Sequence, residues 1–331
     1  MKKKLIAMLL SAAMCLSLAA CGQKADTPDT TDPAEPSGDA ATYTVGICQL
    51  VQHEALDAAT QGFIDALNEA LPGQVKFEEK NASGDSNSCA TIVNGFVSEG
   101  VDLIMANATA ALQAAASATS DIPVLGTSIT AYGVALDIDD FSGTVGGNVS
   151  GTSDLADLSK QADMITEWFP ETQKVGLLFC SAEPNSRYQI EEVAKNLSAK
   201  GIETKEFAFT DSNDVASVTQ SAADYADVVY LPTDNIAASN TEAIANVTVP
   251  AKTPVIAGEE GICKGCGVAT LSISYYDLGM TTGKMAAKIL TGEADISTMP
   301  IEFTTATPKY NASMCETLGI TPLEGYTAIA E

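Results

Sequence analysis

Polar residues with useful chemistry stand directly after apolar, strand-like runs at several points in the chain. Asp234 follows "VVYLPT", Glu259 and Glu260 follow "TPVIAG", and Thr127 and Ser128 end the run "IPVLGTS". Carboxylates accept hydrogen bonds from cationic groups, and hydroxyls or backbone N–H groups at a helix start donate to anionic ones. These residue types therefore suit the charged groups of a small polar molecule.

Each of these side chains also has a purely structural interpretation. Thr109 in "ANAT", Thr127 and Ser128 suit ordinary helix N-caps or turn hydroxyls. Asp234 and Glu259 suit helix caps as well as partners of a cation. The sequence leaves both interpretations open.

Two further pairs of polar residues lie at similar positions. Gln52 and His53 follow the first strand-like run, and Asn185 and Ser186 follow a proline in "EPNS". His53 is the single histidine, and we interpret it as a hydrogen-bonded wall residue rather than as part of a proton relay. The alternative for Asn185 is a turn, which Pro and Asn both favour.

The elements that must position these residues occur twice along the chain. The segments that start at Tyr43 and Lys174 both read strand, amphipathic helix, strand, and the runs 101–109 and 226–235 repeat one pattern of apolar then polar residues. Alternating strands and helices predict parallel sheets, so two copies predict two similar α/β lobes; one extended sheet is the alternative. Because ligands bind beyond the carboxyl ends of parallel strands, the polar residues should face a cleft.

Composition limits the fold class and the partners. Hydrophobic residues make up 46% and charged residues 18% of the 331 residues, which is typical of a folded protein with room for two domains. Asp and Glu outnumber Lys and Arg by 43 to 17. Such a surface repels phosphate backbones, so we expect no nucleic-acid partner.

The first residues indicate an export signal. A basic "MKKK" precedes an apolar run that ends in "LAAC" at Cys21, which resembles the bacterial lipoprotein signal. That resemblance implies a signal peptide over residues 1–20 and lipid on Cys21, which anchors the protein at the outer face of the cell membrane. Residues 21–41 lack large apolar side chains, so we expect a flexible tether.

A family resemblance becomes specific at this point. The segments "VQHEALDAATQGFIDAL", "GTSIT", "VSGTSDL", "EPNS", "YLPTDN" and "SYYDLGMTTGKMAAKILTGEADISTMPIEF" resemble the substrate-binding lipoproteins of a bacterial ABC-transporter family. The resemblance implies a type I periplasmic-binding-protein fold, in which two similar doubly wound parallel-sheet lobes are joined by three crossovers and hold the ligand between them. It also implies that the chain is not an enzyme and delivers a small-molecule ligand to an ABC permease.

The resemblance divides the chain between the lobes. The N-terminal lobe would comprise residues 42–152 plus 276–303, and the C-terminal lobe residues 153–275 plus 304–331. Asp154 would lie at the first crossover and Tyr276 at the second. Asp154 would touch the ligand or brace the hinge, and Tyr275 or Tyr276 would stack on a flat ligand or pack in the core.

Several members of the family take up tryptophan, tyrosine or phenylalanine, which implies an amino-acid cargo. Asp234 would then bind the ammonium group, and Thr109, Thr127 and Ser128 would bind the carboxylate. Asn185 and Ser186 resemble a family loop that reaches into the cleft. A sugar or nucleoside receptor of the same fold, or a receptor that presents its ligand to a membrane signalling protein, are the competing hypotheses.

Motifs for other chemistry are weak. "CKGC" at Cys263 and Cys266 is a lone pair of cysteines, which is a poor zinc signal and leaves a loop disulfide open. "GMTTGKM" departs from the phosphate-binding loop pattern, since Met285 stands where Ser or Thr should follow Lys284. We therefore expect no catalytic residue, metal or cofactor.

Overall fold

A computed structural model of the chain describes residues 43–330. These residues all belong to one compact unit. The expected signal peptide, Cys21 and the tether lie outside the described residues. Over residues 43–330, none of the helices has the length and apolar character of a membrane span.

The first sheet has six parallel strands in the order β11-β5-β4-β3-β1-β2. Its central strands β3 and β4 are buried at every residue, because helices cover both faces. The strands are β1 Tyr43–Gln49, β2 Val75–Asn81, β3 Leu103–Asn107, β4 Val124–Ile129, β5 Val149–Ser153 and β11 Glu302–Phe303.

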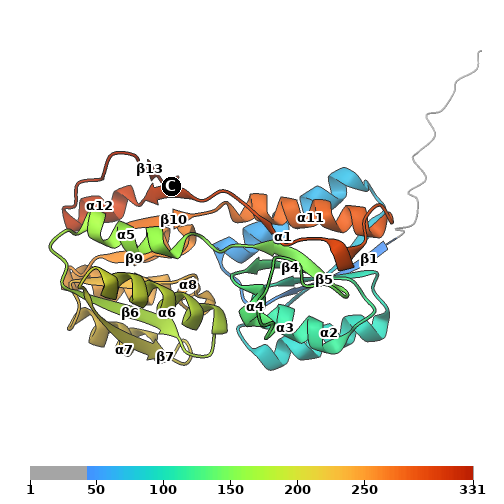
Figure 1. The fold of residues 1–331 in the computed structure, drawn as a ribbon, viewed down its shortest axis with the longest axis horizontal. Coiled ribbons are helices and arrows are strands. Elements are labelled where there is room, and N and C mark those ends of the chain that lie inside the picture. The colour runs from blue at the N-terminus through green and yellow to red at the C-terminus, as the bar shows by residue number, and fades with distance from the viewer. Residues whose placement is uncertain (1–42, 331) are drawn as a thin grey trace, which may run out of the picture. The chain divides into compact units, whose positions relative to one another are not determined.

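Helices α1 (Glu54–Ala70) and α11 (Tyr275–Leu290) lie side by side on one face of this sheet, and α2 (Ser86–Glu99) and α3 (Thr109–Ala118) cover the other (Figure 1). The pairing of α1 with α11 depends on glycine. A Cβ on Gly279 would lie 2.0 Å from the Ala59 carbonyl oxygen, and one on Gly62 would lie 2.2 Å from that of Tyr276. The short helices of this lobe are α4 Tyr132–Ala135 and the 3-10 turn η1 Ile296–Thr298.

The second sheet has seven strands in the order β13-β12-β10-β9-β8-β6-β7. Its strands pair in parallel except for β10 with β12, which are antiparallel. The strands are β6 Lys174–Cys180, β7 Glu203–Phe209, β8 Val228–Leu231, β9 Val255–Ala257, β10 Ala269–Ser272, β12 Thr307–Tyr310 and β13 Thr327–Ala328.

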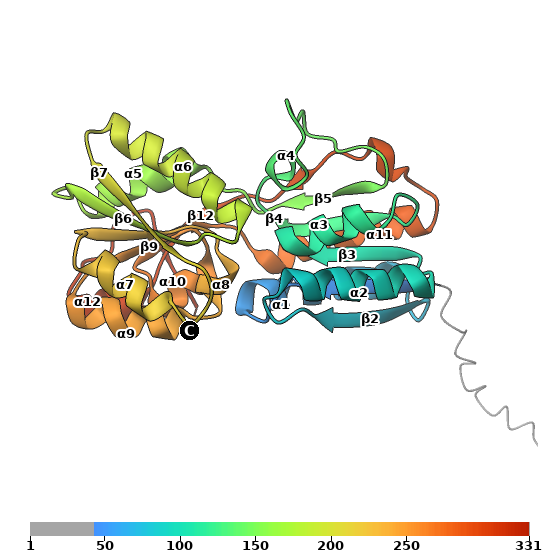
Figure 2. The ribbon, with the colours of Figure 1, turned by 90° about the horizontal axis from the view of Figure 1, so that it is seen from below.

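The second sheet is also covered on both faces (Figure 2). Helices α5 (Leu158–Trp168) and α6 (Pro184–Ala199) pack on one face, and α7 (Val215–Ala223) and α9 (Thr241–Ala251) on the other. The remaining helices of this lobe are α8 Asn235–Ala238, α10 Glu260–Cys266 and α12 Ala312–Leu318.

The two sheets have the same core order, β2-β1-β3-β4-β5 in the first and β7-β6-β8-β9-β10 in the second. The predicted internal repeat is therefore confirmed, and the alternative of one extended sheet is wrong. The chain passes between the sheets three times, after β5, after β10 and after β11. After the second passage α11 returns to pack on α1 of the first lobe.

Candidate functional site

A cavity lies where the carboxyl ends of strands from both sheets meet, as expected for parallel α/β lobes. Its volume is about 10 Å³, roughly the space of one water molecule, so a larger ligand enters only when the surrounding groups move apart. We call it the inner cavity. Its lining residues are His53, Leu56, Ser128, Thr130, Asp154, Asn185, Thr233, Asp234, Asn235, Ala238, Glu259 and Tyr275.

Asp154 and Ser128 present polar atoms that the described residues leave without a partner. Asp154 follows β5 and is 5% exposed; its Oδ2 accepts a 2.9 Å hydrogen bond from the Tyr275 hydroxyl, and its Oδ1 has no partner among residues 43–330. Ser128 is 6% exposed, and its Oγ likewise has no partner among residues 43–330. Burial raises the pKa of Asp154 to about 6, so its carboxylate is mostly ionised at neutral pH.

Local backbone geometry places the Ser128 hydroxyl. The pairing of β4 with β5 shifts register between Gly126 and Ile129, and Ser128 adopts a φ of 56° in this irregular stretch. A left-handed conformation is uncommon for a serine, and at this position it accompanies a side chain that lines the inner cavity.

Asp234 lines the inner cavity, but its carboxylate is held by the backbone. Oδ1 accepts a 2.8 Å hydrogen bond from the N–H of Ala237 and so caps α8, while Oδ2 accepts a 2.6 Å bond from the N–H of Cys180. Burial and the nearby carboxylate of Glu183 raise the pKa of Asp234 to about 7. The helix-cap interpretation of Asp234 is therefore confirmed, and both of its oxygens accept from backbone N–H groups.

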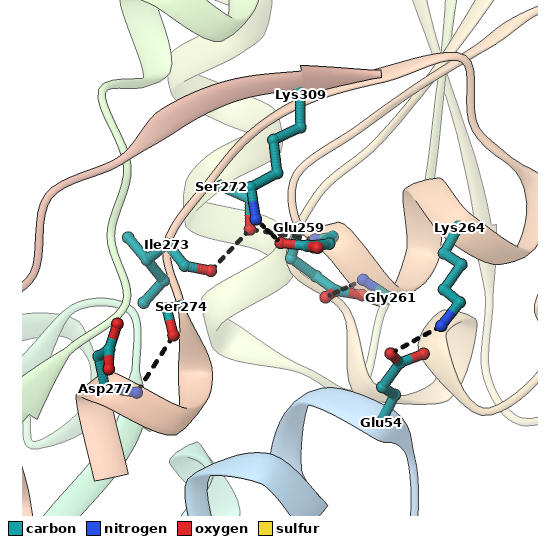
Figure 3. Close-up of polar contacts among 10 residues, drawn as sticks. Glu54, Glu259, Gly261, Lys264, Ser272, Ile273, Ser274, Asp277 and Lys309 are labelled. Atoms are coloured by element: carbon teal, nitrogen blue, oxygen red, sulfur yellow. Dashed lines mark hydrogen bonds and ion pairs between the residues drawn. The ribbon is translucent and has the colours of Figure 1, made fainter. Parts of the chain in front are cut away.

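Glu259 behaves in the same way. It lines the inner cavity, and its carboxylate caps α10 by accepting hydrogen bonds from the N–H groups of Gly261 (Figure 3) and Ile262. Burial raises the pKa of Glu259 to about 7. Its neighbour Glu260 forms an ion pair with Lys309 instead.

Sequence reasoning missed Glu183. Its buried carboxylate accepts hydrogen bonds from both nitrogens of Asn235, from the N–H of Ile236 and from the side chain of Asn185. An acid directly before a proline that starts a helix was the available signal. The segment "EPNS" was expected to form a loop, and that expectation is wrong, because Pro184–Ser186 form the first turn of α6.

The other missed polar wall residues are Thr130, Thr233 and Asn235; Tyr275, one of the two tyrosines considered for stacking, also lines the inner cavity. Asn235 was signalled by its place after Asp234, and Tyr275 by its place at the crossover. Tyr276, which we preferred, lies 40% exposed on the outer side of α11, where its hydroxyl donates to Asp65 at 2.9 Å. The structure does not bring Tyr276 to the inner cavity.

Four other candidates also lie away from the lining of the inner cavity. The Thr127 hydroxyl joins a buried cluster with those of Thr152 (3.3 Å) and Thr282 (3.2 Å). Thr109 is the buried first residue of α3, and Ser186 is buried in the first turn of α6. Gln52 is exposed and lines a second cavity instead.

The second cavity adjoins the inner one and has a volume of about 320 Å³. His53, Ala238 and Glu259 line both cavities. The Nε2 of His53, at the start of α1, lies 3.3 Å from the Oδ1 of Asn235 in the other lobe. Burial lowers the pKa of His53, so its ring is neutral at neutral pH and Nε2 is the donor in this contact.

The cysteines of the described chain are free thiols. Cys263 and Cys266 lie buried in α10, and the disulfide that the sequence left open is not formed. Cys48 and Cys180 end corresponding strands of the two sheets and are buried, as small apolar residues would be. Within residues 43–330 no group of three or more His, Cys, Asp and Glu could hold a metal ion.

Comparison with known families gives a match over residues 44–330 to the ABC transporter substrate binding proteins. The chain belongs to this family. Such proteins bind small molecules outside the cytoplasm and deliver them to ABC permeases, which confirms that the chain is not an enzyme.

Relatives of this substrate-binding protein include one whose ligand is named. The present chain is 31% identical to a tyrosine-binding protein of Clostridioides difficile, over 88% of this chain and 85% of the relative. It is also 31% identical to a Streptococcus pneumonia ABC domain in complex with L-Trp, with a TM-score of 0.82 over 88% of this chain and all of the other.

A third relative differs in shape from this substrate-binding protein. A ligand-free, open structure of an adhesive substrate-binding protein from Clostridium difficile is 33% identical over 87% of this chain and 99% of the other, but has a TM-score of 0.66. More distant solved structures, such as an inositol-bound protein of Bacillus halodurans at 16% identity, share the fold alone. The expected type I periplasmic-binding-protein fold is thereby confirmed.

Proposed function

We propose that this substrate-binding protein captures an amino acid for an ABC importer, with a preference for an aromatic side chain. The observation that carries the proposal is the pair of unpartnered polar atoms in the inner cavity, the Asp154 Oδ1 and the Ser128 Oγ. A buried polar atom without a partner costs free energy, so each atom favours a ligand that supplies one.

An α-amino acid supplies both partners in one molecule. Its ammonium group donates to the ionised Asp154 carboxylate, and its carboxylate accepts from the Ser128 hydroxyl. Asp154 takes this role in place of Asp234, whose two oxygens are already held by backbone N–H groups. Asp234 and Glu259 then act as walls of the site that keep α8 and α10 in place.

The aromatic preference rests on relatives and on the cavity wall. One relative at 31% identity is a tyrosine-binding protein, and the other was solved in complex with L-Trp. In this chain, Tyr275 and His53 place two rings in the wall of the inner cavity. A ligand in contact with both lobes stabilises their closed arrangement. The higher TM-score to the L-Trp complex than to the open relative supports closure of this kind.

The proposed place of action is the outer face of the cell membrane. Signal peptidase would cleave before Cys21, lipid on Cys21 would hold the protein there, and residues 21–41 would form the tether. Mass spectrometry of the protein from membranes tests this part, with a lipid-modified Cys21 as the expected N-terminus.

A thermal-shift screen of the purified protein against the twenty amino acids, sugars and nucleosides tests the cargo. We expect the largest shift with an aromatic amino acid. Asp154→Asn removes the charge and should weaken binding by about tenfold or more. The matched control Asp139→Asn, an exposed loop residue, should bind as the wild type does. A shift with sugars alone, or normal binding by Asp154→Asn, would contradict the proposal.

A further inference from the structure

Two contacts join the lobes at the start of α1. The carboxylate of Glu54, the first residue of α1, lies 3.2 Å from the Nζ of Lys264 in α10 of the other lobe (Figure 3). The adjacent His53 contacts Asn235 of the other lobe. The beginning of this one helix therefore meets the second lobe at two consecutive residues.

The Glu54–Lys264 contact lies at the second cavity rather than inside the ligand site. Glu54 and Lys264 both line the second cavity, and neither lines the inner one. Since His53, Ala238 and Glu259 form a wall common to both cavities, the second cavity is the space directly outside the proposed ligand site. A ligand that leaves in this direction passes the Glu54–Lys264 pair.

Neither charge needs the other for its own helix. Glu54 lies in the first turn of α1 and Lys264 in the last turn of α10, and each sign is the one that the helix dipole favours at that end. Lys264 is also the one cationic residue in the described lining of the second cavity, which holds Glu54 and Glu259 as well. The attraction between the pair therefore acts between the lobes.

We propose that Glu54 and Lys264 form a latch that slows release of the ligand. The pair is intact only while the lobes are together, so its free energy adds to the closed state and not to the open one. The side chains are 62% and 40% exposed, so the latch is weak and is screened by salt. This inference rests on the proposed function, in which the ligand binds in the inner cavity.

Charge reversal tests the latch. Stopped-flow release of L-tyrosine and L-tryptophan is measured for the wild type, Glu54→Lys, Lys264→Glu and the double variant. We expect each single variant to release ligand about three- to tenfold faster, because like charges then face each other across the lobes. The double variant restores opposite charges and the wild-type net charge, so its release rate should return to within about twofold of the wild type.

The Asp163–Lys200 pair is the matched control. Its side chains are 48% and 36% exposed, and it lies wholly within the second lobe, between α5 and the end of α6. Asp163→Lys, Lys200→Glu and their double variant should release ligand at the wild-type rate. High salt should speed release from the wild type and slow it in the single latch variants, since screening weakens attraction and repulsion alike.

A second readout needs no ligand. Spin labels on Ser98→Cys in α2 and Ser217→Cys in α7, both exposed, report the distance between the lobes. The single latch variants should shift this distribution to longer distances, and the double variant should reverse the shift. Unchanged distances, or single variants that release bound ligand at the wild-type rate, would overturn the latch. Failure of the wild type to bind either amino acid would instead count against the proposed function, while the distances still decide on the latch.

Discussion

The two walls of the inner cavity use their polar residues differently. On the side of β4 and β5, Ser128 and Asp154 keep atoms without partners among the described residues. On the side of the second lobe, Asp234 and Glu259 give their oxygens to backbone N–H groups at the starts of α8 and α10. Carboxylates at one cavity can thus either keep an oxygen available for a ligand or stabilise the helices that surround the cavity.

This difference separates the effects of substitution. Removing a carboxylate that caps a buried helix leaves backbone donors without acceptors and lowers the free energy of unfolding. Removing the Asp154 charge leaves the backbone bonded as before and removes a partner of the ligand. Substitutions in the second-lobe wall should therefore lower the free energy of unfolding, and substitutions in the first-lobe wall should lower the affinity for the ligand.

The largest expected effect is on stability. Asp234→Ala should lower the free energy of unfolding by about 2 kcal/mol, because the buried N–H groups of Ala237 and Cys180 lose their acceptor. Urea unfolding measures this. Asp157→Ala removes an exposed cap, that of α5, and should cost about 1 kcal/mol or less because water replaces the carboxylate. If Asp234→Ala were as stable as the wild type but bound no ligand, the carboxylate would be a ligand contact and not a cap.

A smaller effect is expected from pH, and it has opposite signs for stability and binding. The pKa of Asp154 is raised from 3.8 to about 6, so the folded protein binds this proton more tightly than the unfolded chain. The contribution of Asp154 to stability is therefore fully present below the unfolded pKa and is lost as the pH rises through about 6. Affinity for an ammonium group should change in the other direction and fall about fivefold from pH ~6 to pH ~5, because the ionised fraction of the carboxylate falls from about one half to about one tenth.

Comparison with Asp154→Asn isolates this titration. Asp234 and Glu259, each with a pKa raised to about 7, also titrate near neutral pH, but they are common to both proteins. The free energy of unfolding of the wild type, relative to that of the variant, should decrease as the pH rises. The variant's affinity for the ligand should stay nearly constant over the pH range in which the affinity of the wild type declines. Parallel pH profiles of affinity for the two proteins would show that Asp154 does not meet the ligand's charge.

The fold was predictable because its causes are local and repeated. Alternating apolar strands and amphipathic helices occur twice in the sequence, and parallel strands bring their carboxyl ends together. Polar residues after the strands therefore mark the region of the site. His53, Ser128, Asn185, Asp234 and Glu259 were located in this way at the inner cavity, while Asp154 was placed at the first crossover by the family resemblance.

The remaining details depend on contacts that no local pattern encodes. The Thr127 hydroxyl meets Thr282, 155 positions away, only because α11 returns to the first lobe. The same packing against Gly62 turns Tyr275 inward and Tyr276 outward, a choice that adjacent tyrosines do not reveal. Whether Asp234 caps a helix or meets a ligand depends on the position of the Cys180 N–H, which belongs to another strand.

In the proposed complex, the Asp154 carboxylate binds the ligand's ammonium group. The decisive measurement is the affinity of the best amino acid from the screen, and of the same molecule without its amino group, for the wild type and for Asp154→Asn. We predict that loss of the amino group weakens binding to the wild type at least about tenfold more than binding to the variant. An equal loss in the two proteins would show that the ammonium group and Asp154 do not interact, and the account would fail.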